Sequence, residues 1–150
     1  MRSLVRKELR ALILTEHYTV KQNDFVNAGK VSVEIKKILR DTGIPAAIIR
    51  RIAVACYEAE INLIIHSYGG TIDLFIDDDG TVSMYFNDCG PGIPDIEKAM
   101  QQGYSTASDE AKSLGFGAGM GLYNIKRVSD TFKISSSPEG THLFITFKAI

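Results

Sequence analysis

A carboxylate and a carboxamide stand four residues apart near the middle of the chain, at Glu58 and Asn62. If this stretch is helical, both side chains leave the same face of the helix one turn apart. The amide oxygen is a hard ligand of the kind that Mg²⁺ takes, and the carboxylate can orient an attacking hydroxyl or remove its proton. Polar pairs on helices usually mark a solvated face, so this pair alone is a weak signal. Glu60 lies on a different face, and we predict no role for it.

A second cluster follows a strand-like stretch, at Asp88, Gly90 and Gly92. An aspartate at the end of a strand, followed by Gly-x-Gly, combines an acceptor with backbone that a flat ligand can approach closely. A carboxylate facing the exocyclic amine of adenine would select adenine over guanine, which carries a carbonyl at that position. A glycine turn closed by an Asx hydrogen bond explains these residues at least as well when they are taken alone.

A third cluster is a run of alternating glycines directly before a helix-like segment: Gly115, Gly117, Gly119 and Gly121. Backbone N–H groups in such a run can form an anion-binding nest, and the following helix terminus adds the positive end of its dipole. The run is not a Walker A loop, because no Gly-Lys-Ser/Thr follows. It also fails the dinucleotide fingerprint, because Met120 and Leu122 stand where a third glycine is required. A lid over phosphates is favoured above a plain linker.

The spacing of hydrophobic residues predicts the helices and strands that position these clusters. In the first half we expect a strand at 15–21, a helix from within 23–26 to 41–43 that stops at Gly43, and a long helix from Pro45 to His66 that the glycine pair 69–70 ends. In the second half we expect strands at 71–76, 81–86, 131–136 and 141–147, a short helix at 95–101, a loop at 102–118 and a helix from Met120. The acidic turn at 77–80 lacks the later ligands of a calcium loop. This order favours an α+β two-layer sandwich, with helices on one face of a mixed, mostly antiparallel sheet.

Composition limits the class of protein. The length of 150 residues favours one domain, and the net charge of −1 argues against a nucleic-acid partner. No stretch is long and apolar enough for a bilayer, so no membrane association is expected, and the basic first fourteen residues are interpreted as a solvated face. The two cysteines form no disulfide framework and do not have the spacing of metal ligands, which favours a cytoplasmic protein with reduced thiols.

The three clusters, with a hairpin between the first two, resemble in their order the GHKL (Bergerat) ATP-binding fold, where they are the N, G1 and G2 boxes. The chain is most similar to the small serine/threonine kinases of bacterial partner-switching systems, the anti-sigma-factor and switch-kinase (RsbW/RsbT) group, over about residues 15–148. The similarity is strongest over 88–100, over 103–106 and from the glycine lid to 130. The stretch 107–113 makes the lid longer than in the shortest switch kinases.

Carried over by position, the resemblance implies a catalytic base at Glu58, an ATP-binding magnesium ligand at Asn62 and an adenine-binding carboxylate at Asp88. It implies further ATP contacts from the glycine motifs, the lid and the last strand: Gly90, Gly92, Ile93, Ser105, Thr106, Gly115, Gly117, Gly119, Met120, Gly121, Leu122 and Thr141. A capping or solvated role for Ser105 and Thr106 is equally consistent with their positions. For His66, at a place where family members often carry histidine, we expect a packing role.

The resemblance implies an Mg-ATP-dependent kinase that phosphorylates a serine or threonine of a STAS-domain partner. The alternative is an ATP-gated binding module that acts as an anti-sigma factor or activates a PP2C-type phosphatase without obligatory catalysis. A sigma factor or such a phosphatase would then be a further partner. A histidine-kinase catalytic domain is a third, weaker option. Homodimers are common in the anti-sigma branch, although no stripe in this sequence indicates one.

Overall fold

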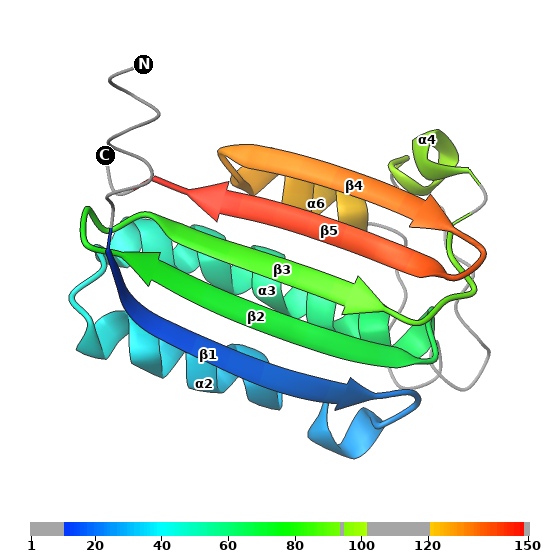
Figure 1. The fold of residues 1–150 in the computed structure, drawn as a ribbon, viewed down its shortest axis with the longest axis horizontal. Helices are drawn as coiled ribbons and strands as arrows, with labels where there is room; N and C mark the ends of the chain where they lie inside the picture. The colour runs from blue at the N-terminus through cyan, green and yellow to red at the C-terminus, as the bar shows by residue number, and fades with distance from the viewer. Residues whose placement is uncertain (1–10, 94, 102–120, 149–150) are drawn as a thin grey trace.

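The structure, a computed structural model, describes residues 11–93, 95–101 and 121–148. Its centre is a five-stranded sheet in the order β1-β2-β3-β5-β4 (Figure 1). The strands are β1 (Leu12–Lys21), β2 (Gly69–Asp77), β3 (Val82–Asp88), β4 (Thr131–Ser137) and β5 (Gly140–Phe147). All four pairings among them are antiparallel. The predicted α+β class is therefore confirmed, and the described sheet is more uniform than the mixed sheet expected.

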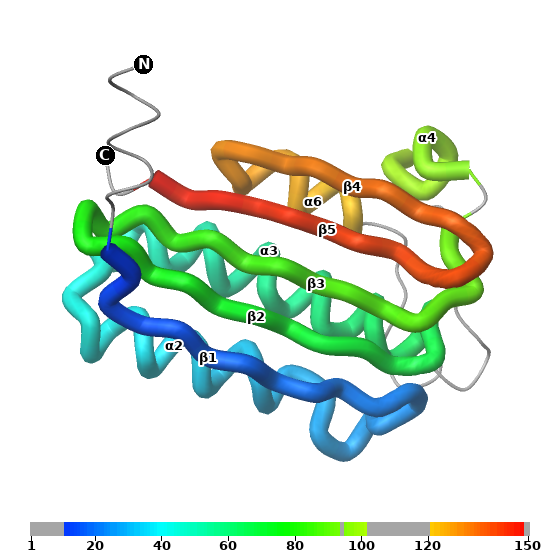
Figure 2. Tube along the Cα trace, in the orientation of Figure 1, coloured from blue at the N-terminus to red at the C-terminus, as the bar shows by residue number. Residues whose placement is uncertain are grey.

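The helices that cover the sheet lie on one of its faces: α2 (Lys30–Asp41), α3 (Ala46–Ile65) and α6 (Gly121–Val128). Figure 2 shows α2 behind β1, α3 behind β2 and β3, and α6 behind β4 and β5. The 3₁₀ turn η1 (Phe25–Asn27) precedes α2, and the short helix α4 (Ile96–Ala99) follows β3. None of the helices in the described ranges has the length and apolar character needed to cross a membrane.

The two-residue period of the strands decides which side chains form the core. On β2, Ile72, Leu74 and Ile76 are fully buried against the helices, whereas Asp73 and Phe75 between them lie on the other face. The inward residues of β3 and β5 repeat this pattern. Each such side chain contributes about 1.5–3 kcal/mol when it leaves water, so this sheet–helix interface provides the main stabilisation of the fold.

Two predicted boundaries were wrong. The helix expected to begin within 23–26 begins at Lys30, because Gly29 adopts a left-handed conformation with φ of 88° and separates α2 from η1. The glycine pair 69–70 does not end the long helix, which stops at Ile65, but opens β2. A Cβ on Gly70 would overlap the carbonyl oxygen of Asn87 on β3, so close strand packing is the reason for glycine there.

Glu60 has a structural role that the sequence did not predict. Its side chain is buried at the junction of α3 with α2. Oε2 accepts hydrogen bonds from the amides of Gly29 (3.0 Å) and Val31 (3.3 Å). Oε1 accepts bonds from the amide (2.9 Å) and the hydroxyl (2.7 Å) of Ser32. The first amides of a helix have no partner within it, so a carboxylate of α3 caps α2 and complements its dipole.

Candidate functional site

Glu58 and Asn62 leave the same face of α3 and meet the first residue of α6. A Cβ built on Gly121 would lie 3.2 Å from both Oδ1 and Nδ2 of Asn62 and 3.3 Å from Oε2 of Glu58. Any side chain at this position would crowd both groups, so glycine allows α6 to begin this close to them. The structure therefore brings the predicted N box together with the last glycine of the predicted lid.

The Glu58 carboxyl is half-buried, and this burial raises its pKa above the ordinary value. A hydrogen bond from the Asn124 side chain opposes part of the rise by stabilising the charged form. A carboxylate with a raised pKa is better matched to proton transfer near neutral pH. Asn124 was not predicted, although its position three residues after Gly121 placed it on the same face of α6.

Asp88 is the last residue of β3 and organises the turn that follows. Its Oδ1 accepts hydrogen bonds from the amides of Gly90 (2.9 Å) and Thr141 (2.8 Å). The bond to Gly90 is the Asx interaction that the sequence offered as an alternative to ligand binding. Within the described residues, Oδ2 accepts no hydrogen bond. One oxygen of this carboxylate thus holds the backbone of the turn together, and a contact of the other oxygen with adenine stays a prediction.

Thr141, predicted from the family's last motif, lies beside Asp88 at the start of β5. Its hydroxyl shares a hydrogen bond of 2.8 Å with the hydroxyl of Ser136, and Ser136 in turn accepts a bond of 2.6 Å from the amide of Ile93. Ser136 was missed in the sequence. The signal was the hairpin register, which places Ser136 directly opposite Thr141. These bonds join the Asp88 turn to both strands of the β4–β5 hairpin.

Gly90 and Gly92 are required by the packing of the chain against itself. A Cβ on Gly92 would overlap the carbonyl oxygen of Ser137, and a Cβ on Gly90 would lie 2.9 Å from that of Pro138. Both glycines also have positive φ values, of 106° at Gly90 and 85° at Gly92. Both glycines therefore accommodate the β4–β5 turn, whatever their relation to adenine. Contact of these two glycines with a nucleotide stays a prediction.

The segment after α3 joins the two halves of the site. The Ser67 hydroxyl donates to the carbonyl of Leu63 (2.7 Å) and accepts from the amide of Gly69 (3.0 Å). The next amide, of Tyr68, donates to the carbonyl of Gly90 (3.0 Å). The end of α3, the end of β3 and the start of β5 consequently meet at one end of the sheet (Figure 2).

The other predicted residues have different surroundings. Leu122 is only 8% exposed, so its side chain belongs to the core and its backbone alone would face a nucleotide. Ile93 packs half-buried against the same core. Burial lowers the pKa of His66 and favours the neutral ring, which agrees with a packing role. Six predicted contacts lie outside the described residues: Ser105, Thr106, Gly115, Gly117, Gly119 and Met120.

The donors in front of Gly121 fit a magnesium ion. Asn62 offers an amide oxygen, and the Glu58 carboxylate lies beside it at the first residue of α6. In the described ranges, no three or more His, Cys, Asp or Glu side chains gather into a dedicated metal site. An amide oxygen and one carboxylate would together hold an Mg²⁺ ion that keeps several waters.

Comparison with known proteins gives the family. The protein-family model described as a histidine kinase-like ATPase domain, which is of the GHKL type, matches residues 22–147. The serine/threonine-protein kinase RsbT of Bacillus subtilis (strain 168) is 31% identical over 112 residues, which cover 72% of this chain and 78% of that protein. The anti-sigma F factor of Bacillus licheniformis is 36% identical over 95 residues, which cover 59% of this chain and 62% of that protein.

A solved structure supports the fold. The RsbU and RsbW domains of Rv1364c from Mycobacterium tuberculosis align with a TM-score of 0.63 at 18% identity, over 90% of this chain and 32% of that one. At this identity the likeness shows the fold alone, and the chain spans about a third of that longer protein. The family match, in contrast, includes Glu58, Asn62 and the whole Asp88 turn. The chain therefore belongs to the family of histidine kinase-like ATPase domains.

Proposed function

We propose that this chain is an Mg-ATP-dependent serine/threonine protein kinase of a bacterial partner-switching system, and that its substrate is a STAS-domain protein. The observation that carries the proposal is the position of Glu58 and Asn62 in front of Gly121, with Asn124 holding the carboxylate. The relative RsbT is named a serine/threonine-protein kinase, which favours transfer to a hydroxyl over transfer to histidine.

Each residue has one task in this proposal. Glu58 takes the proton of the acceptor hydroxyl, Asn62 turns its amide oxygen to Mg²⁺, and Oδ2 of Asp88 accepts a hydrogen bond from the exocyclic amine of adenine. Mg²⁺, when bound, neutralises charge on the phosphate oxygens. The first amides of α6, from Gly121 onward, have no carbonyl partner within that helix and so favour an anion. Positioning and charge stabilisation supply most of the catalysis, because phosphoryl transfer asks little covalent chemistry of the protein.

A second candidate function is an ATP-gated binding module that sequesters a sigma factor or activates a PP2C-type phosphatase. The observation that favours it is the similarity to a protein named anti-sigma F factor. In this case, ATP bound between Asp88 and α6 orders a partner-binding surface, and the Glu58 carboxylate is not required. One protein can have both functions, and the substitution Glu58→Gln distinguishes them.

The test is transfer of label from γ-labelled ATP to purified STAS-domain proteins from the same genome. We expect acid-stable label on one of them, and Glu58→Gln should abolish it while ATP binding is kept. Glu97→Gln, at an exposed carboxylate on α4, is the control and should transfer normally. Normal transfer by Glu58→Gln would contradict the assignment of the base.

Other outcomes favour the alternative functions. ATP-dependent capture of a sigma factor by Glu58→Gln, without transfer by the wild-type protein or the variant, would favour the binding module. Acid-labile label would indicate phosphohistidine.

A further inference from the structure

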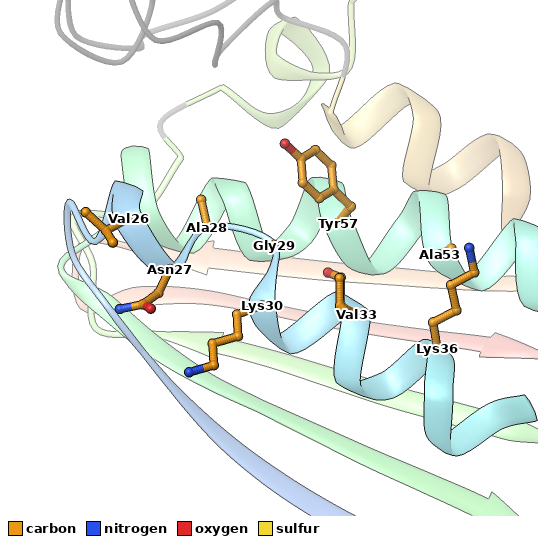
Figure 3. A pocket seen from close by; sticks show the side chains of 10 residues that line it. Val26, Asn27, Ala28, Gly29, Lys30, Val33, Lys36, Ala53 and Tyr57 are labelled. Carbon is orange, nitrogen blue, oxygen red and sulfur yellow. The ribbon is translucent and has the colours of Figure 1, made fainter. Parts of the chain in front are cut away.

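A groove of about 540 Å³ lies beside α3 and takes no part in the proposed kinase site. Figure 3 shows its two walls, on α2 and α3, with η1 at one end. Lys30, Val33 and Lys36 follow each other at three-residue spacing and form one stripe along α2. Ala53 and Tyr57, four residues apart, form the facing stripe on α3.

The groove exposes apolar groups that a folded protein usually buries. The exposed fraction is 95% for Val26, 69% for Val33 and 42% for Tyr57. Val26 belongs to η1, whose neighbouring Phe25 packs on the core, so the turn presents one apolar side chain inward and the next one to solvent. Contiguous exposed apolar surface in a hollow is typical of a contact surface for another molecule.

The charge of the groove has one sign. Its lining contains Lys30 and Lys36 and no aspartate or glutamate. Within the described part of the chain, neither lysine forms an ion pair. Three carboxylates lie close to this lining: Asp24 accepts from the side chain of Asn27, Glu34 follows Val33 on α2, and Glu60 uses both of its oxygens to cap the first turn of α2 from inside. The charged side chains that line the groove itself are therefore the two lysines, and they favour an acidic occupant.

We propose that the groove docks an amphipathic segment of a partner protein, with apolar side chains against Val26, Val33 and Tyr57 and acidic side chains toward Lys30 and Lys36. A groove between two helices suits such a segment, whereas small molecules bind in sites that enclose them and converge several polar groups on them. Tyr57 directly precedes Glu58, so the occupant lies beside the turn of α3 that carries the proposed base. The identity of the occupant as the STAS-domain substrate rests on the proposed function.

The first test uses a synthetic helical peptide with leucines on one face and glutamates on the other, and a matched peptide with lysines in place of the glutamates. In an NMR titration without ATP, the acidic peptide should cause saturable shifts at Val26, Val33 and Tyr57. Val26→Asp and Lys36→Glu should each weaken its binding about tenfold. Lys37→Glu, next on α2 but outside the groove, should leave binding unchanged. The inference would be overturned if the acidic peptide does not bind, or if its saturable shifts lie outside the groove. It would also be overturned if both peptides bind equally, or if the groove variants bind the acidic peptide as tightly as the wild type.

The second test separates docking from catalysis. With a STAS-domain protein that accepts label, Lys36→Glu should raise the KM for that protein and leave kcat and ATP affinity unchanged. The peptide titration needs no ATP, so binding of the acidic peptide without any transfer would refute the kinase and keep the groove. Transfer with an unaltered KM in Lys36→Glu and Val26→Asp would refute the groove as the substrate dock and keep the kinase.

Discussion

Asn124 on α6 donates a side-chain hydrogen bond to Glu58 on α3. The bond links the helix that follows the predicted lid to the carboxylate proposed as the base. It also acts against burial, because burial favours the neutral carboxyl and the bond favours the carboxylate. The protonation of Glu58 therefore depends on whether α6 stays packed on α3.

Asn124→Ala removes this bond, so the pKa of Glu58 should rise further above its ordinary value. A base must be deprotonated to act, and the acid limb of the pH profile of kcat should then move to higher pH. The profile is measured by phosphate transfer to the protein substrate. Tyr123→Ala, at the exposed neighbouring position on α6, should keep the wild-type limb. An acid limb that stays in place in Asn124→Ala would contradict the link.

Asp88→Asn should weaken ATP binding about ten- to a hundredfold. The asparagine oxygen can still accept from the amides of Gly90 and Thr141, so the turn keeps its shape. The carboxylate oxygen proposed to face the adenine amine becomes an NH₂ group, and two donors then oppose each other. Calorimetric titration with ATP measures the loss, and Asp78→Asn in the exposed β2–β3 turn is the control. Equal affinity for ATP in Asp88→Asn would refute the role of Asp88.

Gly121→Ala should reduce phosphate transfer about a hundredfold, because the new Cβ displaces Glu58 and Asn62 by a small distance. Stability should be kept or slightly raised, since alanine is a better helix former than glycine. Gly92→Ala provides the contrast. Its Cβ overlaps the carbonyl of Ser137 at a positive φ, so the free energy of unfolding should fall by more than about 1 kcal/mol. Denaturant unfolding and transfer assays on both variants test whether Gly121 affects activity and Gly92 affects stability. Loss of both stability and activity in Gly121→Ala would contradict this expectation.

Glu60→Ala should lower the free energy of unfolding by about 3 kcal/mol, since four donors on Gly29, Val31 and Ser32 lose a buried acceptor. Glu60→Gln keeps one acceptor oxygen and should cost less. Urea unfolding measures both changes. Glu34→Ala, at an exposed position of α2, is the control. A Glu60→Ala protein as stable as Glu34→Ala would show that the cap is dispensable.

Local pattern in the sequence predicted much of the fold and brought the right segments together. The strands and helices follow from the spacing of hydrophobic residues. The Glu58–Asn62 spacing places both groups on one face of a helix before any tertiary contact is known. The turn at Asp88 follows from its own glycines. These predictions concern residues within a few positions of each other, where backbone geometry alone decides the outcome.

Partners that are distant in sequence were not predictable in the same way. Glu60 finds its donors 28 to 31 residues earlier, and Ser136 bonds the amide of Ile93 across 43 residues. The clearance at Gly92 was assigned to a ligand, because the sequence does not show that Ser137 lies against it. Each of these relations depends on how α2 packs on α3 or on where the β4–β5 hairpin lies, which single-sequence patterns do not contain.

The close approach of Gly90 and Gly92 to the β4–β5 turn has a consequence for engineering. The carbonyls of Ser137 and Pro138 lie where a Cβ of Gly92 or Gly90 would be, so an insertion that moves these carbonyls would disturb their packing on the two glycines. Epitope tags, fluorophores or circularly permuted termini belong instead in the β2–β3 turn, at the opposite end of the sheet, where Asp78 and Asp79 are exposed (Figure 1). A reporter inserted there leaves the packing of the Asp88 turn undisturbed.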